Sequence, residues 1–271
     1  MTTSLHHRHP AVAGSFYPGS ARQLSVDVDT FLAEAGDYRG ITPKALIVPH
    51  AGYIYSGPVA AHAYASLAAA RSLIRRVVLL GPVHRFAING IALPTATCFD
   101  TPLGPVDVDT SSQLALLALP QVIQSDSAHI AEHSLEVQLP FLQKLLDWFE
   151  VLPLAVGMAS PDEVAEVLDL VWGGPETLIV VSSDLSHYRP YREAQEVDQE
   201  TARMILALKP LASHQQACGA TPVNGLCLCA KRRGLTPHLL DLRNSGDTAG
   251  DRSRVVGYGA FAFTEEHAHA S

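Results

Sequence analysis

The chain has few cysteines, few charged side chains and no long apolar run. Only four cysteines occur in 271 residues, namely Cys98, Cys218, Cys227 and Cys229. Disulfide frameworks belong mainly to small secreted domains, so these scattered cysteines predict buried free thiols. No apolar run reaches eighteen residues, and the N-terminal segment MTTSLHHRHP has no apolar core of the kind found in signal peptides. We therefore expect no membrane span and a cytoplasmic protein.

Basic clusters are also lacking. Charged residues make up 17% of the chain, and the net charge is −8. Nucleic acids and anionic membranes attract clustered Lys and Arg, so we expect neither as a partner. The 47% hydrophobic content is enough for a large buried core. We find no repeat and no linker, which predicts one domain over 1–271, with 1–9 and 267–271 flexible.

The apolar pattern predicts an α/β fold. Buried strands are indicated by four apolar runs, at 44–48, 76–80, 150–154 and 178–182. Helical patterns lie at 59–75, 136–148, 162–170, 194–208 and 211–233. Alternating strands and helices indicate a single domain with a mostly parallel or mixed central sheet flanked by helices. We also expect a hairpin insertion at 89–108, and an antiparallel edge strand in the final segment VVGYGAFAFTEE.

Histidines follow three of the four apolar runs. His50 comes after KALIV, His84 after RVVLL, and His187 with Asp184 after LIVVS, while His133 lies in AEHSLEVQ. Ligands of open α/β sheets bind at the carboxyl ends of the strands, where these side chains would meet. Imidazole is a ligand suited to iron, zinc, copper and nickel. The pattern therefore predicts a metal-dependent site, although each histidine could instead hydrogen-bond the backbone at the end of a strand or helix.

A third ligand of the carboxylate type would complete the set that holds Fe(II) in non-haem oxygenases. Residues that could supply this carboxylate are Asp247, Asp251, Asp184, Glu132 and Glu136. A histidine outside the ligand set could act as an acid or base, because its ordinary pKa lies near neutrality. His6, His7 and His9 are weak ligand candidates, since the start of the chain is expected to be mobile.

At these residues the chain resembles the Memo family, which includes the AmmeMemoRadiSam system protein B of bacteria and archaea. The matching segments are PAVAGSFYP, PHAGYIYSGPVAAHAY, LLGPVHR, EHSLEVQLPFL, SSDLSHY and NSGDTAGDRSRVVGYGAFAF. The resemblance implies the fold of the class III extradiol dioxygenases. It also implies a functional link to AMMECR1-like and radical SAM proteins.

The same resemblance implies roles for single residues. His50 and His84 would be metal ligands, and Asp247 would take the place of a cysteine of the animal Memo proteins. His187 would be the general base, Asp184 would hold or tune it, and His133 would line the pocket.

Three functions remain open at this point. The first is an iron-dependent oxygenase, with Fe(II) (or Zn or Cu) in the pocket and a catechol-like or other chelating small molecule as substrate. The second is a zinc metallohydrolase. The third is a non-catalytic binding module whose pocket takes a peptide or a protein partner, with contacts from Tyr53, Tyr55, Tyr188 and Arg189.

Overall fold

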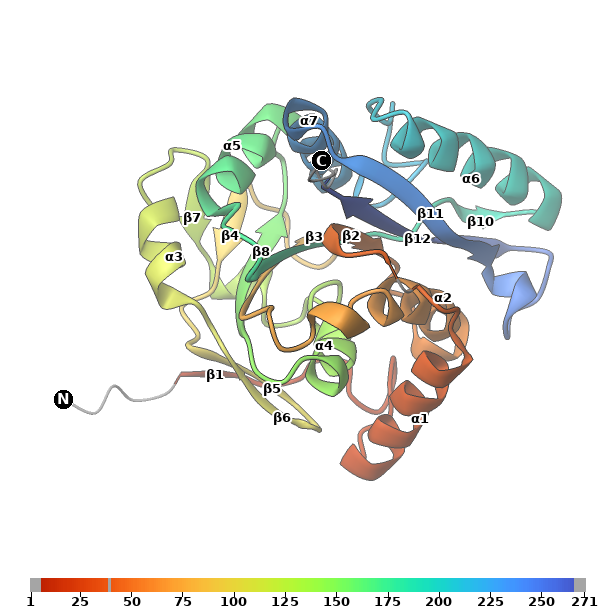
Figure 1. Cartoon of the computed structure of the whole chain (residues 1–271), viewed down its shortest axis with the longest axis horizontal. Coiled ribbons are helices and arrows are strands. Elements are labelled where there is room, and N and C mark those ends of the chain that lie inside the picture. The colour runs from red at the N-terminus through yellow and green to blue at the C-terminus, as the bar shows by residue number, and fades with distance from the viewer. Residues whose placement is uncertain (1–5, 39, 266–271) are drawn as a thin grey trace, which may run out of the picture.

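Four parallel strands form the centre of the protein. The computed structural model describes residues 6–38 and 40–265 (Figure 1). Its central sheet has nine strands, in the order β10-β12-β2-β9-β3-β8-β4-β7, with β11 also paired to β12. The predicted apolar runs are the parallel neighbours β2 (Pro43–Val48), β9 (Thr177–Ser182), β3 (Arg76–Pro82) and β8 (Glu150–Val156). The predicted α/β class with a mixed sheet is confirmed.

Antiparallel strands extend this centre on both sides. The C-terminal strand β12 (Val255–Thr264) is antiparallel to β2, as predicted, but it is not an edge strand. Its other neighbours are β11 (Thr236–Asn244) and the short β10 (His187–Arg189). On the opposite side, β4 (Ile91–Leu93) runs antiparallel to β8 and pairs with β7 (Val122–Gln124).

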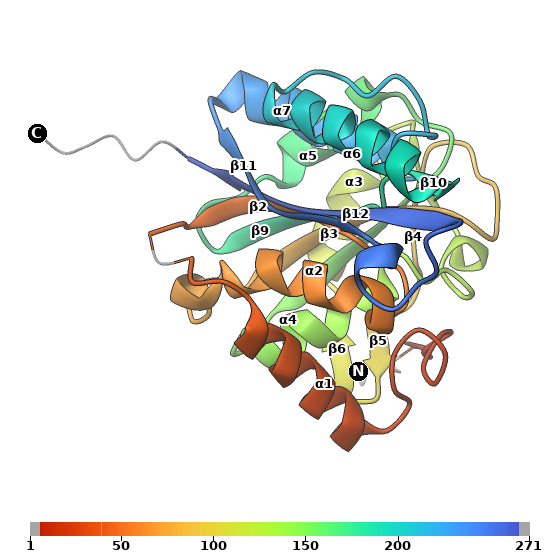
Figure 2. The ribbon, with the colours of Figure 1, turned by 90° about the vertical axis from the view of Figure 1, so that its right-hand side faces the viewer.

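Helices cover both faces of the sheet, as Figure 2 shows. One face carries α1 (Ala21–Glu34), α2 (Tyr53–Ala65) and α4 (Leu139–Leu145). The other carries α3 (Thr110–Leu116), α5 (Pro161–Val171), α6 (Tyr191–Leu206) and α7 (Ala220–Arg233). Side chains of a strand alternate between the faces, so β2 sends Leu46 and Val48 into one core and Ala45 and Ile47 into the other.

Three of the predicted helices differ from the observed ones by several residues. The helix predicted at 59–75 begins at Tyr53 and ends at Ala65, with a separate 3₁₀ turn at Ala68–Ala70. The one predicted at 136–148 is a 3₁₀ turn, Glu136–Gln138, followed by α4. The one predicted at 211–233 begins only at Ala220, because the chain before it folds back and the Leu211 amide donates to Asn224.

The start of the chain pairs with the predicted insertion. The insertion contains the hairpin of β5 (Cys98–Thr101) and β6 (Gly104–Asp107), and β1 (His7–Arg8) lies parallel to β5. Within the segment 1–9, which is predicted to be flexible, His7–Arg8 form β1, and residues 1–5 and 266–271 lie outside the described residues. Within the described part of the chain, no helix is long and apolar enough to cross a membrane.

Arg8 is fixed by a buried ion pair. Its guanidinium contacts Glu136, and both side chains are almost wholly buried. The guanidinium also donates to the carbonyls of His129 and Glu132. The Glu136 carboxylate accepts further hydrogen bonds from the amides of Ala11 and Val12 at 2.7 and 3.0 Å. This ion pair ties the N-terminal segment to the body of the protein.

Breaking this ion pair should destabilise the protein strongly. Arg8→Met leaves the Glu136 carboxylate buried without its cation, which should cost about 3–5 kcal/mol of unfolding free energy. Urea unfolding followed by circular dichroism measures the difference. Arg71→Ala is the control, since its ion pair with Asp147 is exposed and should be worth at most about 1 kcal/mol. A loss for Arg8→Met no larger than for Arg71→Ala would contradict the assigned role.

Candidate functional site

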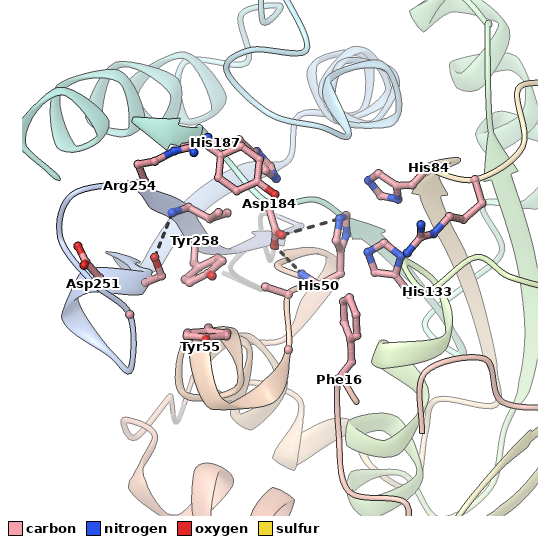
Figure 3. A pocket seen from close by; sticks show the side chains of 17 residues that line it. Phe16, His50, Tyr55, His84, His133, Asp184, His187, Asp251, Arg254 and Tyr258 are labelled. Carbon is pink, nitrogen blue, oxygen red and sulfur yellow. Dashed lines mark hydrogen bonds and ion pairs between the residues drawn. The ribbon is translucent and has the colours of Figure 1, made fainter. Parts of the chain in front are cut away.

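Three histidines meet at the carboxyl edge of the sheet (Figure 3). His50 follows β2, His84 follows β3, and His133 precedes the 3₁₀ turn at Glu136–Gln138. One ligand atom from each of them lies within 4.8 Å of the others. Their ring centroids are 4.7–5.4 Å apart. Three segments distant in sequence therefore present imidazoles to one point.

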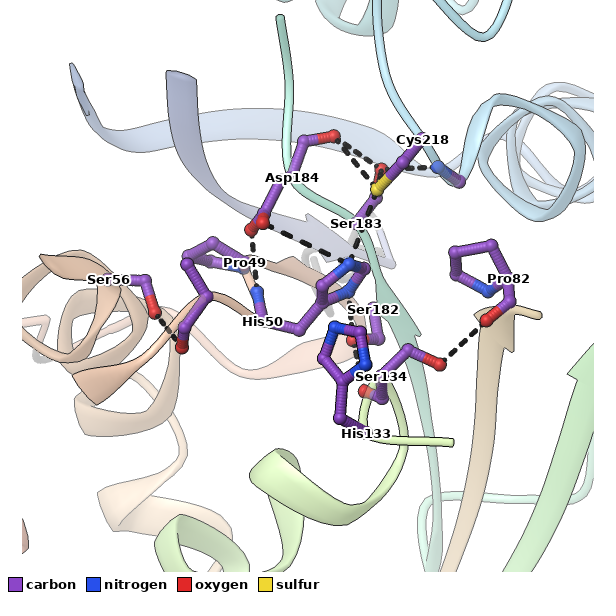
Figure 4. A network of polar contacts seen from close by, with 12 residues as sticks. Pro49, His50, Ser56, Pro82, His133, Ser134, Ser182, Ser183, Asp184 and Cys218 are labelled. Carbon is purple, nitrogen blue, oxygen red and sulfur yellow. Dashed lines mark hydrogen bonds and ion pairs between the residues drawn. The ribbon is translucent and has the colours of Figure 1, made fainter. Parts of the chain in front are cut away.

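Two of the rings, those of His50 and His84, are oriented by a polar group behind them, as Figure 4 shows for His50. His50 Nδ1 lies 2.9 Å from Ser182 Oγ, and its amide donates to Asp184 at 2.7 Å. His84 Nδ1 lies 2.9 Å from Glu132 Oε1. Histidines that bind metals usually use their second nitrogen in this way, which fixes the ring and makes it a better donor.

Glu132 supports two of the rings at once. Its Oε1 is 2.9 Å from His84 Nδ1 and 3.3 Å from His133 Nδ1. The amides of His84, His133 and Ser134 also donate to the carboxylate. Burial alone would raise the pKa of Glu132, but the His84 contact and the amide donors outweigh it and lower that pKa to about 2. The carboxylate is thus a fixed negative charge beneath the histidines.

Burial keeps His50 and His133 neutral. It lowers the pKa of His50 to about 3, helped by the nearby His84, and lowers the pKa of His133 to about 4, helped by His50. A neutral imidazole has the free lone pair that a metal requires. His133 Nδ1 is also buried without a hydrogen-bond partner, since its contact with Glu132 lacks hydrogen-bond geometry. Three imidazoles that converge in this way fit a divalent transition metal such as Fe, Zn or Cu.

A cavity of about 580 Å³ opens beside these rings. Aromatic side chains form much of its wall, namely Phe16, Tyr55, Tyr188 and Tyr258, and two arginines reach it, Arg85 and Arg254. His187 also faces this cavity. Its Nδ1 lies 2.9 Å from the Leu185 carbonyl, a contact that in the neutral ring places the proton on Nδ1 and the lone pair on Nε2.

Comparisons with known proteins agree with the motifs. A family model described as Memo-like protein matches residues 8–262. This chain belongs to the Memo-like family. Three relatives, each described as a MEMO1 family protein, come from Sulfolobus acidocaldarius, Aquifex aeolicus and Methanosarcina acetivorans. They are 38%, 37% and 38% identical, over 93%, 93% and 94% of this chain and 97%, 97% and 98% of their own lengths.

The structure of this Memo-like protein does not bring Asp247 to the histidines. Asp247 is exposed, contacts the Tyr191 hydroxyl, and accepts from the Asn244 amide at 3.0 Å. Its carboxylate thereby caps the 3₁₀ turn Ser245–Asp247 and lies on a different cavity. The loop residues that line the histidine cavity are Ser245, Gly250 and Asp251. The predicted third ligand, Asp247, is therefore not brought together with His50 and His84, and the third side chain beside them is His133.

The other acidic candidates have separate positions. Asp184 lines the cavity, is buried, and bonds the His50 amide, with its carboxylate 3.9 Å from His50 Nε2. Asp251 lines the cavity at its exposed end, and Glu136 belongs to the Arg8 ion pair. Sequence reasoning missed Glu132 as the support of two histidines. Its place directly before His133 was the available signal.

The neutral histidines should make the metal-free protein sensitive to acid. On unfolding, His50 and His133 return to an ordinary pKa of about 6.5. The unfolded chain then binds more protons below pH 6.5, so stability should fall as the pH falls toward 4. Urea unfolding in EDTA across this range measures the slope. The double variant His50→Gln, His133→Gln should lower it by up to about 1.4 kcal/mol per pH unit for each histidine.

The control for the pH series is His238→Gln. His238 lies on β11, and within the described residues its ring hydrogen-bonds Thr264. This variant should keep the slope of the unmodified protein. If the double variant also kept it, the two pocket histidines would not be the groups held neutral by folding.

Proposed function

We propose that this Memo-like protein is a metal-dependent enzyme whose metal is held by His50, His84 and His133. The observation that carries the proposal is the convergence of these imidazoles within 4.8 Å, beside a cavity large enough for a small molecule. The preferred metal is Fe(II), with Zn or Cu as alternatives, because all three accept imidazole ligands.

The cavity favours an aromatic or chelating anion as substrate. Three neutral imidazoles add no negative charge to a divalent ion, so a catechol-like molecule that binds as an anion would supply it. Tyr55, Tyr188 and Tyr258 offer flat apolar faces, and Arg85 and Arg254 add positive charge at the wall. Bound Fe(II) would bring this substrate and O₂ together, which is the chemistry of an oxygenase.

His187 is the proposed general base. Its Nδ1–H is directed to the Leu185 carbonyl, which leaves the Nε2 lone pair free to take a proton from a substrate hydroxyl. His187 lines the same cavity as His50 and His84. Asp184 bonds the His50 amide, and burial raises the pKa of its carboxyl.

A zinc metallohydrolase is the second candidate. The position of Asp247 favours it, because a ligand set of three histidines without a carboxylate is also the set of catalytic zinc sites. In that case the bound ion would activate water, and no O₂ would be consumed. The aromatic wall would equally suit a peptide, which is the non-catalytic alternative. The link to AMMECR1-like and radical SAM proteins stays a prediction.

Metal analysis and oxygen uptake test the proposal together. After anaerobic loading with Fe(II), each chain should hold iron that His50→Ala removes, and a panel of catechols should yield a substrate that consumes O₂. Asp247→Asn is the matched control and should retain iron, since its carboxylate caps a turn. Zinc as the bound metal, with hydrolysis and no O₂ uptake, would favour the metallohydrolase. Iron lost from Asp247→Asn but kept by His50→Ala would overturn the ligand assignment.

Replacing His187 should separate binding from turnover. In His187→Gln the metal ligands are untouched, so metal content should stay the same while the turnover rate falls by about 10²–10⁴-fold. Steady-state kinetics on the substrate found above, with metal analysis of the same sample, provides the measurement. Turnover within a factor of two of the unmodified protein would exclude His187 as the base.

A further inference from the structure

A second group of metal-ligating side chains lies on the small sheet, away from the histidine cavity. In the parallel pair of β1 and β5, His7 is opposite Cys98. Side chains two residues apart on a strand point to the same face, so His9 and Asp100 extend from the same side as His7 and Cys98. The sheet thus gathers two imidazoles, a thiol and a carboxylate on one face.

The distances agree with this placement. His7 Nδ1 and His9 Nδ1 each lie 2.8 Å from a different oxygen of Asp100. Cys98 Sγ lies 3.8 Å from Asp100 Oδ1. Ligand atoms of His7, Cys98 and Asp100 all lie within 4.8 Å of one another. His9 is largely exposed, with 81% of its side chain accessible, so it can turn toward the other three at little cost.

We propose that His7, His9, Cys98 and Asp100 form a second metal site, which takes Zn²⁺. Imidazole, thiolate and carboxylate are the three ligand types that zinc uses, commonly four at a time in a tetrahedron. Calcium and magnesium prefer oxygen ligands and would not select this set. On binding, the Cys98 thiol gives its proton to solvent, and the thiolate bonds the ion.

The site would clamp the start of the chain. Two of its ligands belong to the segment that contains β1, and two belong to β5. The ion would therefore cross-link β5 to the very short strand β1. Arg8 lies between the two histidines and makes the buried ion pair with Glu136. Glu136 in turn bonds the amides of Ala11 and Val12, at the base of the loop that carries Phe16 into the cavity wall. Zinc at β1 would therefore stabilise one wall of the other site.

The test uses the full chain in a background of His50→Ala with His84→Ala, which removes the first site. With Zn²⁺ as the probe, equilibrium dialysis should give one ion per chain, and the melting temperature should rise with zinc concentration. With Co²⁺ as the probe, the thiolate ligand should give a sulfur-to-cobalt charge-transfer band. Cys98→Ser should abolish that band, and His7→Gln should weaken the binding of both ions at least tenfold.

Two further variants keep the result decisive. His9→Gln changes an exposed side chain, so it should weaken zinc binding without unfolding the protein. His238→Gln, on β11, is the matched control and should bind zinc like the background. No zinc bound in the background, or a charge-transfer band that survives Cys98→Ser, would overturn the proposal. Because the first site is absent from this background, either result leaves the assignment of His50, His84 and His133 unaffected.

Discussion

The segment 132–138 joins the carboxyl ends of three central strands. The Ser134 hydroxyl donates to the Pro82 carbonyl at the end of β3, at 2.8 Å. The Gln138 side chain donates to the Pro49 carbonyl after β2 and to Ser182 at the end of β9, at 3.0 and 2.8 Å. Strands of a parallel sheet end at one edge, but their loops are free to separate. This segment holds the loops together, and it is also the segment that carries His133.

The charges of the same segment determine the chemistry that the histidines can support. Glu132 is the fixed anion beneath His84 and His133, with its pKa lowered to about 2. Because Glu132 contacts the histidine rings from behind, its carboxylate can balance part of a cation's charge without itself being a ligand of the ion. The face of the ion toward the cavity would remain open to a substrate. Glu136, four residues later, uses its charge differently, since it anchors Arg8.

The sequence was most informative where burial is complete. Strands β2, β3, β8 and β9 are almost wholly buried, so each reads as an unbroken apolar run that is hard to mistake. Elements that contain polar residues were harder to predict. β11, with the sequence TPHLLDLRN, is only half-buried and shows no such run, and its pairing with β12 is what removes the predicted edge. β1 has two residues, too few for any periodic pattern.

The histidines were predictable for a related reason. His50 and His84 directly follow buried strands, so the sheet fixes both their position and their approximate direction. The position of His7 depends instead on pairing with a strand about ninety residues away, which no local pattern reveals.

Asp247 shows the limit of reading a ligand from a motif. The loop NSGDTAGD has several polar residues, and only its folded conformation decides which of them faces the cavity. Asn244 and Asp247 cap the two ends of one 3₁₀ turn. Asp247 does not line the histidine cavity, whereas Ser245, Gly250 and Asp251 of the same loop do. The three imidazoles that we propose as metal ligands would bring no negative charge of their own. If the proposed metal is bound there, an anion from the substrate or from solvent would add to the charge of Glu132, and the charge of the substrate would influence its binding in this pocket.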